Sequence, residues 1–298
     1  MLDAAVTVGT FDGVHLGHQM VLKALIRKAR ELRLHSVVVT FDQHPLRIVR
    51  PEHAPPELTT HGEKEQILSL YDVDRIHIVP FTKELSHYPP ERFVTEILIG
   101  QFRMKHLVIG YDHGFGKGRS GDVETLQRIG RELGFGVDVV PPYDVDGQHV
   151  SSSRIRALLQ EGRIAEANHA LGRPYAIRGR VARGDGRGRQ LGMPTANLEL
   201  DDPNKLLPLP GIYAVQVGAA QGVMHLGPRP TFVGAGPTIE VHLFDFDEDI
   251  YHQTITVEVH GRIRGIEKFE TIDELVTAMQ NDARAARGLL TRRSGTSA

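Results

Sequence analysis

One segment near the start of this 298-residue chain decides its fold: Val8-Gly9-Thr10-Phe11-Asp12-Gly13-Val14-His15-Leu16-Gly17-His18. The β-branched run over residues 4–8 predicts a strand that ends at Gly9. Apolar residues then recur at helical spacing from Val21 to Leu32. The segment therefore predicts a strand, a glycine-containing turn and the first turn of a helix.

His15 and His18 stand at the N-terminus of this predicted helix. Such an end exposes unpaired N–H groups and the positive end of the helix dipole, so it suits a phosphate group. A buried turn with two surface histidines is the alternative, because short motifs often match by chance.

Composition is that of an ordinary globular protein, with 40% hydrophobic and 24% charged residues and a net charge of −2. The length allows two domains, each with its own core. The near-neutral charge gives no support for a mainly electrostatic nucleic-acid binder, and the absence of cysteine excludes disulfides and thiolate zinc sites. With no apolar run near the ~20 residues of a membrane span and no room for a signal peptide, we expect a cytoplasmic protein.

Strand and helix patterns alternate in the first half of the chain. Strands are predicted over residues 4–8, 36–41, 75–79, 105–109 and 136–140, with helices after His18, near Thr60, at Pro89-Pro90 and at Asp122. This alternation predicts an α/β fold with a doubly wound, Rossmann-like parallel sheet. Ligands bind at the carboxyl ends of such strands, which are followed here by segments 9–18, 40–45, 110–122 and 150–156.

The pattern changes near residue 172. Short alternating runs over residues 176–182, 212–217, 222–226, 238–244 and 254–260 predict an antiparallel barrel or sandwich. Thr271 and Glu274 have the spacing of a capping box and predict a terminal helix. We therefore expect two domains, residues 1–172 and residues 173–298.

Ser151-Ser152-Ser153-Arg154-Ile155-Arg156 opens another predicted helix. Hydroxyl, backbone N–H and guanidinium donors together suit a polyphosphate. Simple N-capping by serine is the alternative, but the histidine motif upstream favours phosphate.

Two segments of the second half carry polar chemistry. Residues 178–189 hold five arginines and four glycines; without aromatic residues they fit a phosphate-covering flap better than a nucleic-acid surface. In Gly192-Met193-Pro194-Thr195-Ala196-Asn197, Thr195 and Asn197 share a face of an extended segment and could bind a hard cation such as Mg²⁺. A plain turn is the alternative.

Glu240 alternates with Ile239 and Val241, so its ordinary interpretation is a solvated, outward carboxylate.

Taken in order, GTFDGVHLGH, TFDQHP, GYDHGFGKGRSGD and VSSSRIR resemble the adenylyltransferase module of the bifunctional prokaryotic riboflavin kinase/FAD synthetases. PTAN, GPRPTF, IEVHLFDF and EKF resemble their riboflavin kinase module. The resemblance runs from about Ala5 to Asp282. His113 and Gly114 stand where the family usually has Phe and Arg, and His225 where it tends to have Asn.

The resemblance implies an N-terminal HxGH nucleotidyltransferase domain and a C-terminal β-barrel. It implies that His15 and His18 stabilise charge on the ATP phosphates, and that Thr195 and Asn197 hold Mg²⁺ while Glu240 acts as general base. Further nucleotide-binding positions would be Gly9, Phe11, Asp112, Ser152, Ser153, Arg156, Gly184 and Gly192, and flavin-binding positions Thr40, Phe41, His44 and Arg264.

The implied function is phosphorylation of riboflavin to FMN by ATP, then adenylylation of FMN to FAD with release of pyrophosphate. Riboflavin, FMN, FAD and ATP are the expected small-molecule partners, with no nucleic acid or membrane; a weak homo-oligomer is left open. One alternative is a riboflavin kinase whose adenylyltransferase domain has weakened. The other is a non-catalytic flavin-binding protein.

Overall fold

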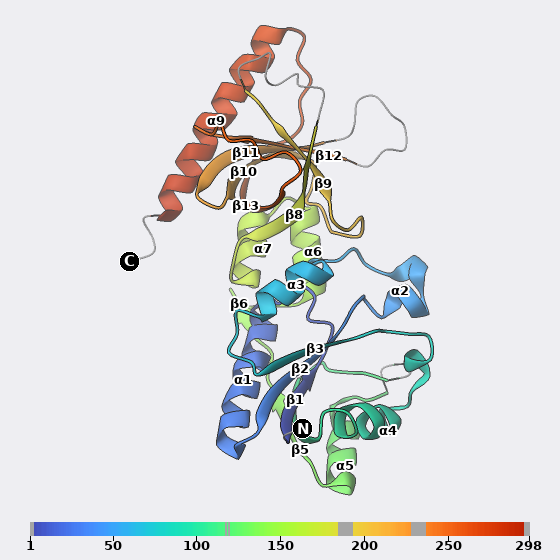
Figure 1. Cartoon of the computed structure of the whole chain (residues 1–298). Helices are drawn as coiled ribbons and strands as arrows, with labels where there is room; N and C mark the ends of the chain where they lie inside the picture. Colours follow the sequence, from blue (N-terminus) through green and yellow to red (C-terminus); the bar gives the residue numbers. More distant parts are fainter. Residues whose placement is uncertain (1–2, 117, 119, 184–192, 228–236, 295–298) are drawn as a thin grey trace. The chain divides into compact units, whose positions relative to one another are not determined.

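The computed structural model describes residues 3–116, 118, 120–183, 193–227 and 237–294 (Figure 1). Contacts within the chain divide it into two compact units, one up to Ser152 and one from Ser153 onward. Helices α6 (Ser152–Gln160) and α7 (Ile164–Leu171) thereby fall almost wholly in the second unit. The division into domains at residue 172 stays a prediction.

The first unit contains the predicted parallel sheet. Its five strands lie in the order β3-β2-β1-β4-β5, with bounds β1 Ala4–Val8, β2 His35–Phe41, β3 Arg75–Val79, β4 Met104–Gly110 and β5 Gly136–Val140. All residues of β1 are buried, as expected for the central strand of a sheet covered on both faces. The doubly wound α/β prediction is confirmed.

Helices cover both faces of this sheet (Figure 1). One face packs against α1 (Leu16–Leu32) and α3 (His61–Leu68), and the other against η3 (Phe93–Ile99) and α5 (Val123–Leu133). The capping box of α3 is present, because Thr60 Oγ1 accepts from the Glu63 backbone and the Glu63 carboxylate accepts from the Thr60 backbone. Shorter elements are α2 (Leu46–Val49), η1 (Pro51–His53), η2 (Leu85–His87) and α4 (Pro90–Arg92).

The helix predicted at Pro89-Pro90 differs from expectation. It begins as the short α4 and continues as the π-helix η3. The wider winding is visible at its end, where the Gly100 N–H donates to the Thr95 carbonyl, 2.9 Å away and five residues back. A two-stranded ribbon, β6 (Asp144–Val145) and β7 (Gln148–His149), follows β5.

The second unit contains a closed antiparallel barrel, which removes the sandwich alternative. Its strand order is β10-β11-β12-β9-β8-β13, with bounds β8 Tyr175–Ala182, β9 Ala196–Leu200, β10 Gly211–Val217, β11 Ala220–Gly227, β12 Thr238–Leu243 and β13 Thr254–Arg264. The terminal helix α9 (Ile272–Ser294) packs against β10, β11 and β13. Its Ala286 and Leu290 bury Ala214 of β10.

Alternation along the strands sorts the barrel residues into two faces. Ile239, Val241 and Leu243 of β12 are buried, whereas Glu240 and His242 between them are half-buried. Val223 packs on the α9 side, and it lies opposite His242 in the β11–β12 register. His242 and Glu240 therefore belong to the outer face of the barrel.

Candidate active sites

The turn after β1 has an unusual backbone. Phe11 has φ +48° and Val14 has φ +38°, flanking Gly13 at φ +83°. Positive φ is costly for a β-branched residue, so the surroundings must hold Val14 in this conformation. Backbone strain of this kind is concentrated at binding and catalytic sites.

Buried hydrogen bonds to distant segments supply that support. The Asp12 carboxylate, whose residue is 6% exposed, accepts from the Thr59 N–H at 3.0 Å. Thr59 Oγ1 in turn accepts from the Gly13 N–H at 3.0 Å. Ser152 Oγ donates to the Asp12 carbonyl at 2.9 Å. The structure thus brings Ser152, from the serine-rich segment, to the histidine-bearing turn, as the sequence predicts for one binding region.

The start of α1 stacks the two predicted histidines. Their rings lie 3.7 Å apart between centroids and 17° from parallel. His15 is the N-cap, and its Nδ1 accepts from the His18 N–H at 3.3 Å. The Phe11 ring lies 5.2 Å from that of His18. Two imidazoles and a helix N-terminus therefore face one region, which favours an anionic ligand there.

Gly17 leaves space for this stack. A Cβ at position 17 would lie 3.2 Å from Cε1 and Nδ1 of His15. That is tighter than an ordinary contact, so a larger residue here would displace the imidazole.

The end of β2 lies beside this turn. Thr40 Oγ1 donates to the Thr10 carbonyl at 3.2 Å. Thr40 and Phe41, predicted to contact flavin, are both buried, and the Phe81 ring meets Phe41 edge-on at 5.1 Å. His44 Nδ1 accepts from the Leu46 N–H at 3.2 Å, so His44 also shapes the start of α2.

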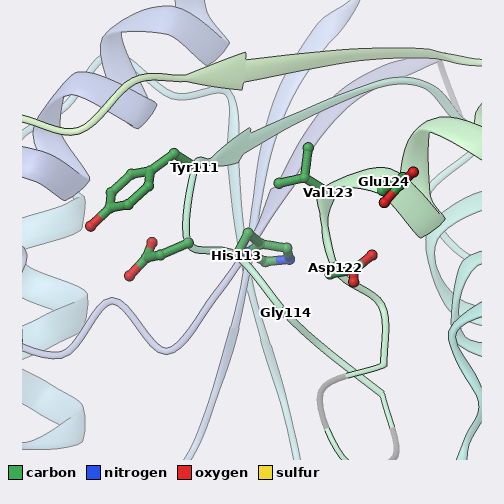
Figure 2. A pocket seen from close by; sticks show the side chains of 7 residues that line it. Tyr111, His113, Gly114, Asp122, Val123 and Glu124 are labelled. Carbon is green, nitrogen blue, oxygen red and sulfur yellow. The ribbon is translucent and has the colours of Figure 1, made fainter.

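A hollow of about 430 Å³ follows β4 in the glycine-rich segment (Figure 2). Asp112 helps to line it, and in Figure 2 the His113 ring lies between Tyr111 and Asp122. Asp122 also caps α5 by accepting from the Thr125 N–H at 2.9 Å. Burial raises the pKa of Tyr111, and the carboxylates of Asp112 and Asp144 raise it further. No arginine is among the described residues lining this hollow.

Three predicted kinase residues come together on the outer face of the barrel. Asn197 of β9 lies directly opposite Glu240 of β12, and Thr195 Oγ1 is 3.5 Å from Glu240 Oε2. On the other side of Glu240, His225 of β11 is its register partner. Burial lowers the pKa of His225, the Glu240 charge raises it and the Arg264 charge lowers it.

Arg264, predicted to contact flavin, makes a bidentate ion pair. Its Nε and Nη2 donate to the two carboxylate oxygens of Asp282 at 2.8 and 2.7 Å. Hydrogen bonding to this carboxylate raises the pKa of Arg264. The pair joins the end of β13 to α9, which is a structural role compatible with any further contact to ligand.

For the remaining predicted residues, the structure gives only the element to which they belong or does not describe them. Ser153 and Arg156 lie on α6 in the second unit. Gly184 and Gly192, the second half of the arginine-rich flap (residues 184–189) and all of the GPRPTF motif except Gly227 lie outside the described residues. In the part of the chain that the structure does describe, no group of three or more His, Asp or Glu side chains is arranged to hold a metal, and no helix is long and apolar enough to cross a membrane.

Comparison with known proteins separates the two units in the same way. Residues 2–154 match the family model of FAD synthetase, and residues 171–290 match that of riboflavin kinase. The bifunctional riboflavin kinase/FMN adenylyltransferase of Escherichia coli K12 is 36% identical over 94% of this chain and 91% of its own length. The chain belongs to this bifunctional family. Its Pseudomonas fluorescens member is 38% identical over 95% of this chain and 92% of its own length.

A solved structure shares nearly the whole fold with this member of the family. It is described as a macrolide-efflux protein from Streptococcus pneumoniae, with TM-score 0.86, 31% identity and coverage of 96% of this chain and 94% of that one.

One buried charge next to the first site has no signal in the sequence. Lys64 of α3 is 7% exposed and donates to two backbone carbonyls, of Thr10 and Phe41. A lysine in a predicted helix is usually solvated, so the residue itself gave no signal.

Proposed function

We propose that this chain catalyses two successive ATP-dependent reactions, with the site residues predicted from sequence. The domain of residues 173–298 would convert riboflavin and ATP to FMN and ADP, and the domain of residues 1–172 would convert FMN and ATP to FAD and pyrophosphate. The observation that carries this proposal is the match of one chain to both family models, in parts with separate folds.

In adenylyl transfer, a phosphate oxygen of FMN attacks the α-phosphorus of ATP while the bond to pyrophosphate breaks. No protein nucleophile is needed, because alignment and charge stabilisation do the catalysis. The stacked His15 and His18 at the N-terminus of α1 would stabilise the charge that develops on the α-phosphoryl group. Gly9, Phe11, Asp112, Ser152, Ser153 and Arg156 would bind the nucleotide, and Thr40, Phe41 and His44 the flavin.

In the kinase reaction, the ribityl 5′-hydroxyl of riboflavin attacks the γ-phosphorus of ATP, and ADP leaves. Glu240 would take the hydroxyl proton as general base. Its outward, half-buried position leaves the carboxylate accessible to a substrate hydroxyl. Gly184 and Gly192 would bind the ATP phosphates, and Arg264 would contact the flavin.

Mg²⁺ fits the donors beside Glu240. Thr195 supplies a hydroxyl oxygen and Asn197 an amide oxygen, both next to the Glu240 carboxylate, and hard oxygen donors suit Mg²⁺ when nucleotide phosphates complete its coordination. When bound, the ion would neutralise phosphate charge. Thr195 and Asn197 would orient it through their side-chain oxygens.

The test is to incubate the purified chain with riboflavin, ATP and Mg²⁺ and to separate the flavins by chromatography over time. We expect FMN to appear first and FAD to follow, with ADP and pyrophosphate as the co-products. FMN that accumulates without FAD would identify a kinase alone. Tight flavin binding without ATP consumption would contradict both activities.

A further inference from the structure

A buried lysine joins the two strand ends of the first site. Lys64 Nζ donates to the Phe41 carbonyl at 2.6 Å and to the Thr10 carbonyl at 3.3 Å. Phe41 is the last residue of β2, and Thr10 lies two residues beyond the end of β1. One ammonium group therefore holds two neighbouring strand ends at a set separation.

The surroundings are arranged to keep this charge inside the protein. Burial lowers the pKa of Lys64, while the negative charges of Asp12, Glu57 and Asp42 raise it. Asp12 and Glu57 are themselves buried, and Arg47 donates to Glu57 at 2.9 Å. A buried charge is retained in a fold only when such partners compensate for its loss of hydration.

The packing of α3 fixes where the ammonium lies. The capping box at Thr60 and Glu63 sets the first turn of α3, and Thr59, just before it, holds Asp12 and Gly13 of the turn. Lys64 thus approaches the turn after β1 from a helix that is already anchored to that turn.

We propose that Lys64 is a positioning residue for adenylyl transfer, because it fixes the turn assigned to ATP against the strand end assigned to the flavin. This role rests on the proposed function. Lys64 reaches both segments through backbone carbonyls, so it acts on their spacing and not on the reacting atoms.

A residue that sets spacing has a particular kinetic signature. Each substrate still meets its own segment, so binding of ATP alone or FMN alone is largely kept. Transfer needs both at once, and a misplacement of about 1 Å can cost ~100-fold in rate.

The experiment compares Lys64→Met with the wild-type chain. Methionine keeps an unbranched side chain but removes the N–H donors. We expect kcat for FAD formation from supplied FMN to fall about 10- to 100-fold, while the KM values for ATP and FMN in that same reaction change by less than about threefold. Riboflavin phosphorylation on the same chain should be unchanged, because its proposed residues lie in the other unit, and thermal unfolding of the variant reports whether the first unit is folded.

Two further variants make the result specific. Lys23→Met changes an exposed lysine of α1 in the same unit and should leave both reactions unchanged. Lys64→Gln keeps N–H donors on a shorter side chain, so its kcat should lie between those of wild type and Lys64→Met. If Lys64→Met does not fold, a kcat below that of wild type with retained substrate binding in Lys64→Gln supports the role, and a wild-type kcat in that variant contradicts it.

The two proposals fail differently. A wild-type chain that forms no FAD contradicts the proposed function, and the role of Lys64 with it. A wild-type chain that forms FAD while Lys64→Met has the same kcat contradicts the role of Lys64 alone. So does a Lys64→Met variant whose lost activity is explained entirely by weaker ATP or FMN binding.

Discussion

The turn after β1 and the outer face of the barrel around Glu240 reach their geometry by opposite routes. The turn has positive φ at Phe11 and Val14. Hydrogen bonds from residues distant in the sequence support it: Thr59 is 46 positions from its partner Gly13, and Ser152 is 140 positions from its partner Asp12. Around Glu240, regular strands place Asn197 and His225 by register alone. We infer that the first site is sensitive to changes in remote supports, and the second to changes on its own strands.

The largest expected effect is that of Glu240→Gln, which tests whether the two reactions use separate sites. Glu240→Gln replaces the proposed base by a neutral amide of the same shape, so riboflavin phosphorylation should fall about 10²- to 10⁴-fold. FAD formation from supplied FMN should stay at the wild-type rate. Initial rates of both reactions measure this, with Glu199→Gln at an exposed position of β9 as control. Equal loss of both reactions would mean that the sites are not separate.

The reciprocal change is His18→Ala. It removes one imidazole of the stack at the N-terminus of α1, and FAD formation should fall about 10²- to 10³-fold. Phosphorylation of riboflavin should continue, so FMN accumulates in the flavin chromatogram. His53→Ala, at an exposed histidine of η1, is the matched control. A His18→Ala chain that still makes FAD at the wild-type rate would remove this histidine from the mechanism.

A smaller effect tests whether the braced turn tolerates displacement. Gly17→Ala introduces a Cβ that would lie 3.2 Å from the His15 ring. The imidazole must shift by a few tenths of an ångström, and we expect a loss of about tenfold in FAD formation. Stability should not fall, because alanine favours helix over glycine. Thermal unfolding and initial rates together check this, and a stable variant of full activity would show that the stack is tolerant.

The smallest expected effect is a change in stability from the hydrogen bonds between Ser36 and Asp74. These residues lie at the amino ends of β2 and β3, away from the proposed ligand sites. The Asp74 carboxylate accepts from the Ser36 N–H and hydroxyl, both at 2.7 Å, and these bonds lower the pKa of Asp74. A carboxylate whose pKa is lower in the folded state than in the unfolded state stabilises the fold at pH values above its unfolded pKa of about 3.9. This contribution to stability is lost as the pH falls through the folded-state pKa.

Asp74→Asn should therefore lower the unfolding free energy at pH 7 by about 1 kcal/mol, a value reduced for a half-exposed group. The difference from wild type should shrink below about pH 4. Urea unfolding at both pH values measures it, and both enzyme rates should be unchanged at pH 7. If the difference in unfolding free energy between Asp74→Asn and wild type does not change with pH, the effect comes from the shape of the side chain and not from its charge.

Much of this architecture could be predicted from sequence, because buried strands leave long apolar runs. β1, β3 and β5 have the predicted bounds. The sequence does not predict β9 as a strand, since Pro194 and Asn197 favour a turn and only pairing with β8 and β12 extends the segment. The π-helical winding of η3 likewise has no sequence pattern of its own.

The candidate sites divide in the same way. The sequence motifs identified His15, His18, Thr195, Asn197 and Glu240 as candidates, but not the strand register that places Asn197 opposite Glu240. Nor could they indicate that the guanidinium of Arg264 binds Asp282, or that Lys64 is buried, because both depend on contacts with residues 18 and 54 positions away.

The closure of the barrel also sets the order in which the chain can fold during synthesis. β8 must pair with β13, so the barrel cannot close before residue 264 has emerged from the ribosome. The parallel sheet has all its strands once residue 140 has emerged. We expect the sheet to fold first, as N-terminal domains generally do. Synthesis halted inside the barrel would leave strands with unpaired edges, which favour aggregation.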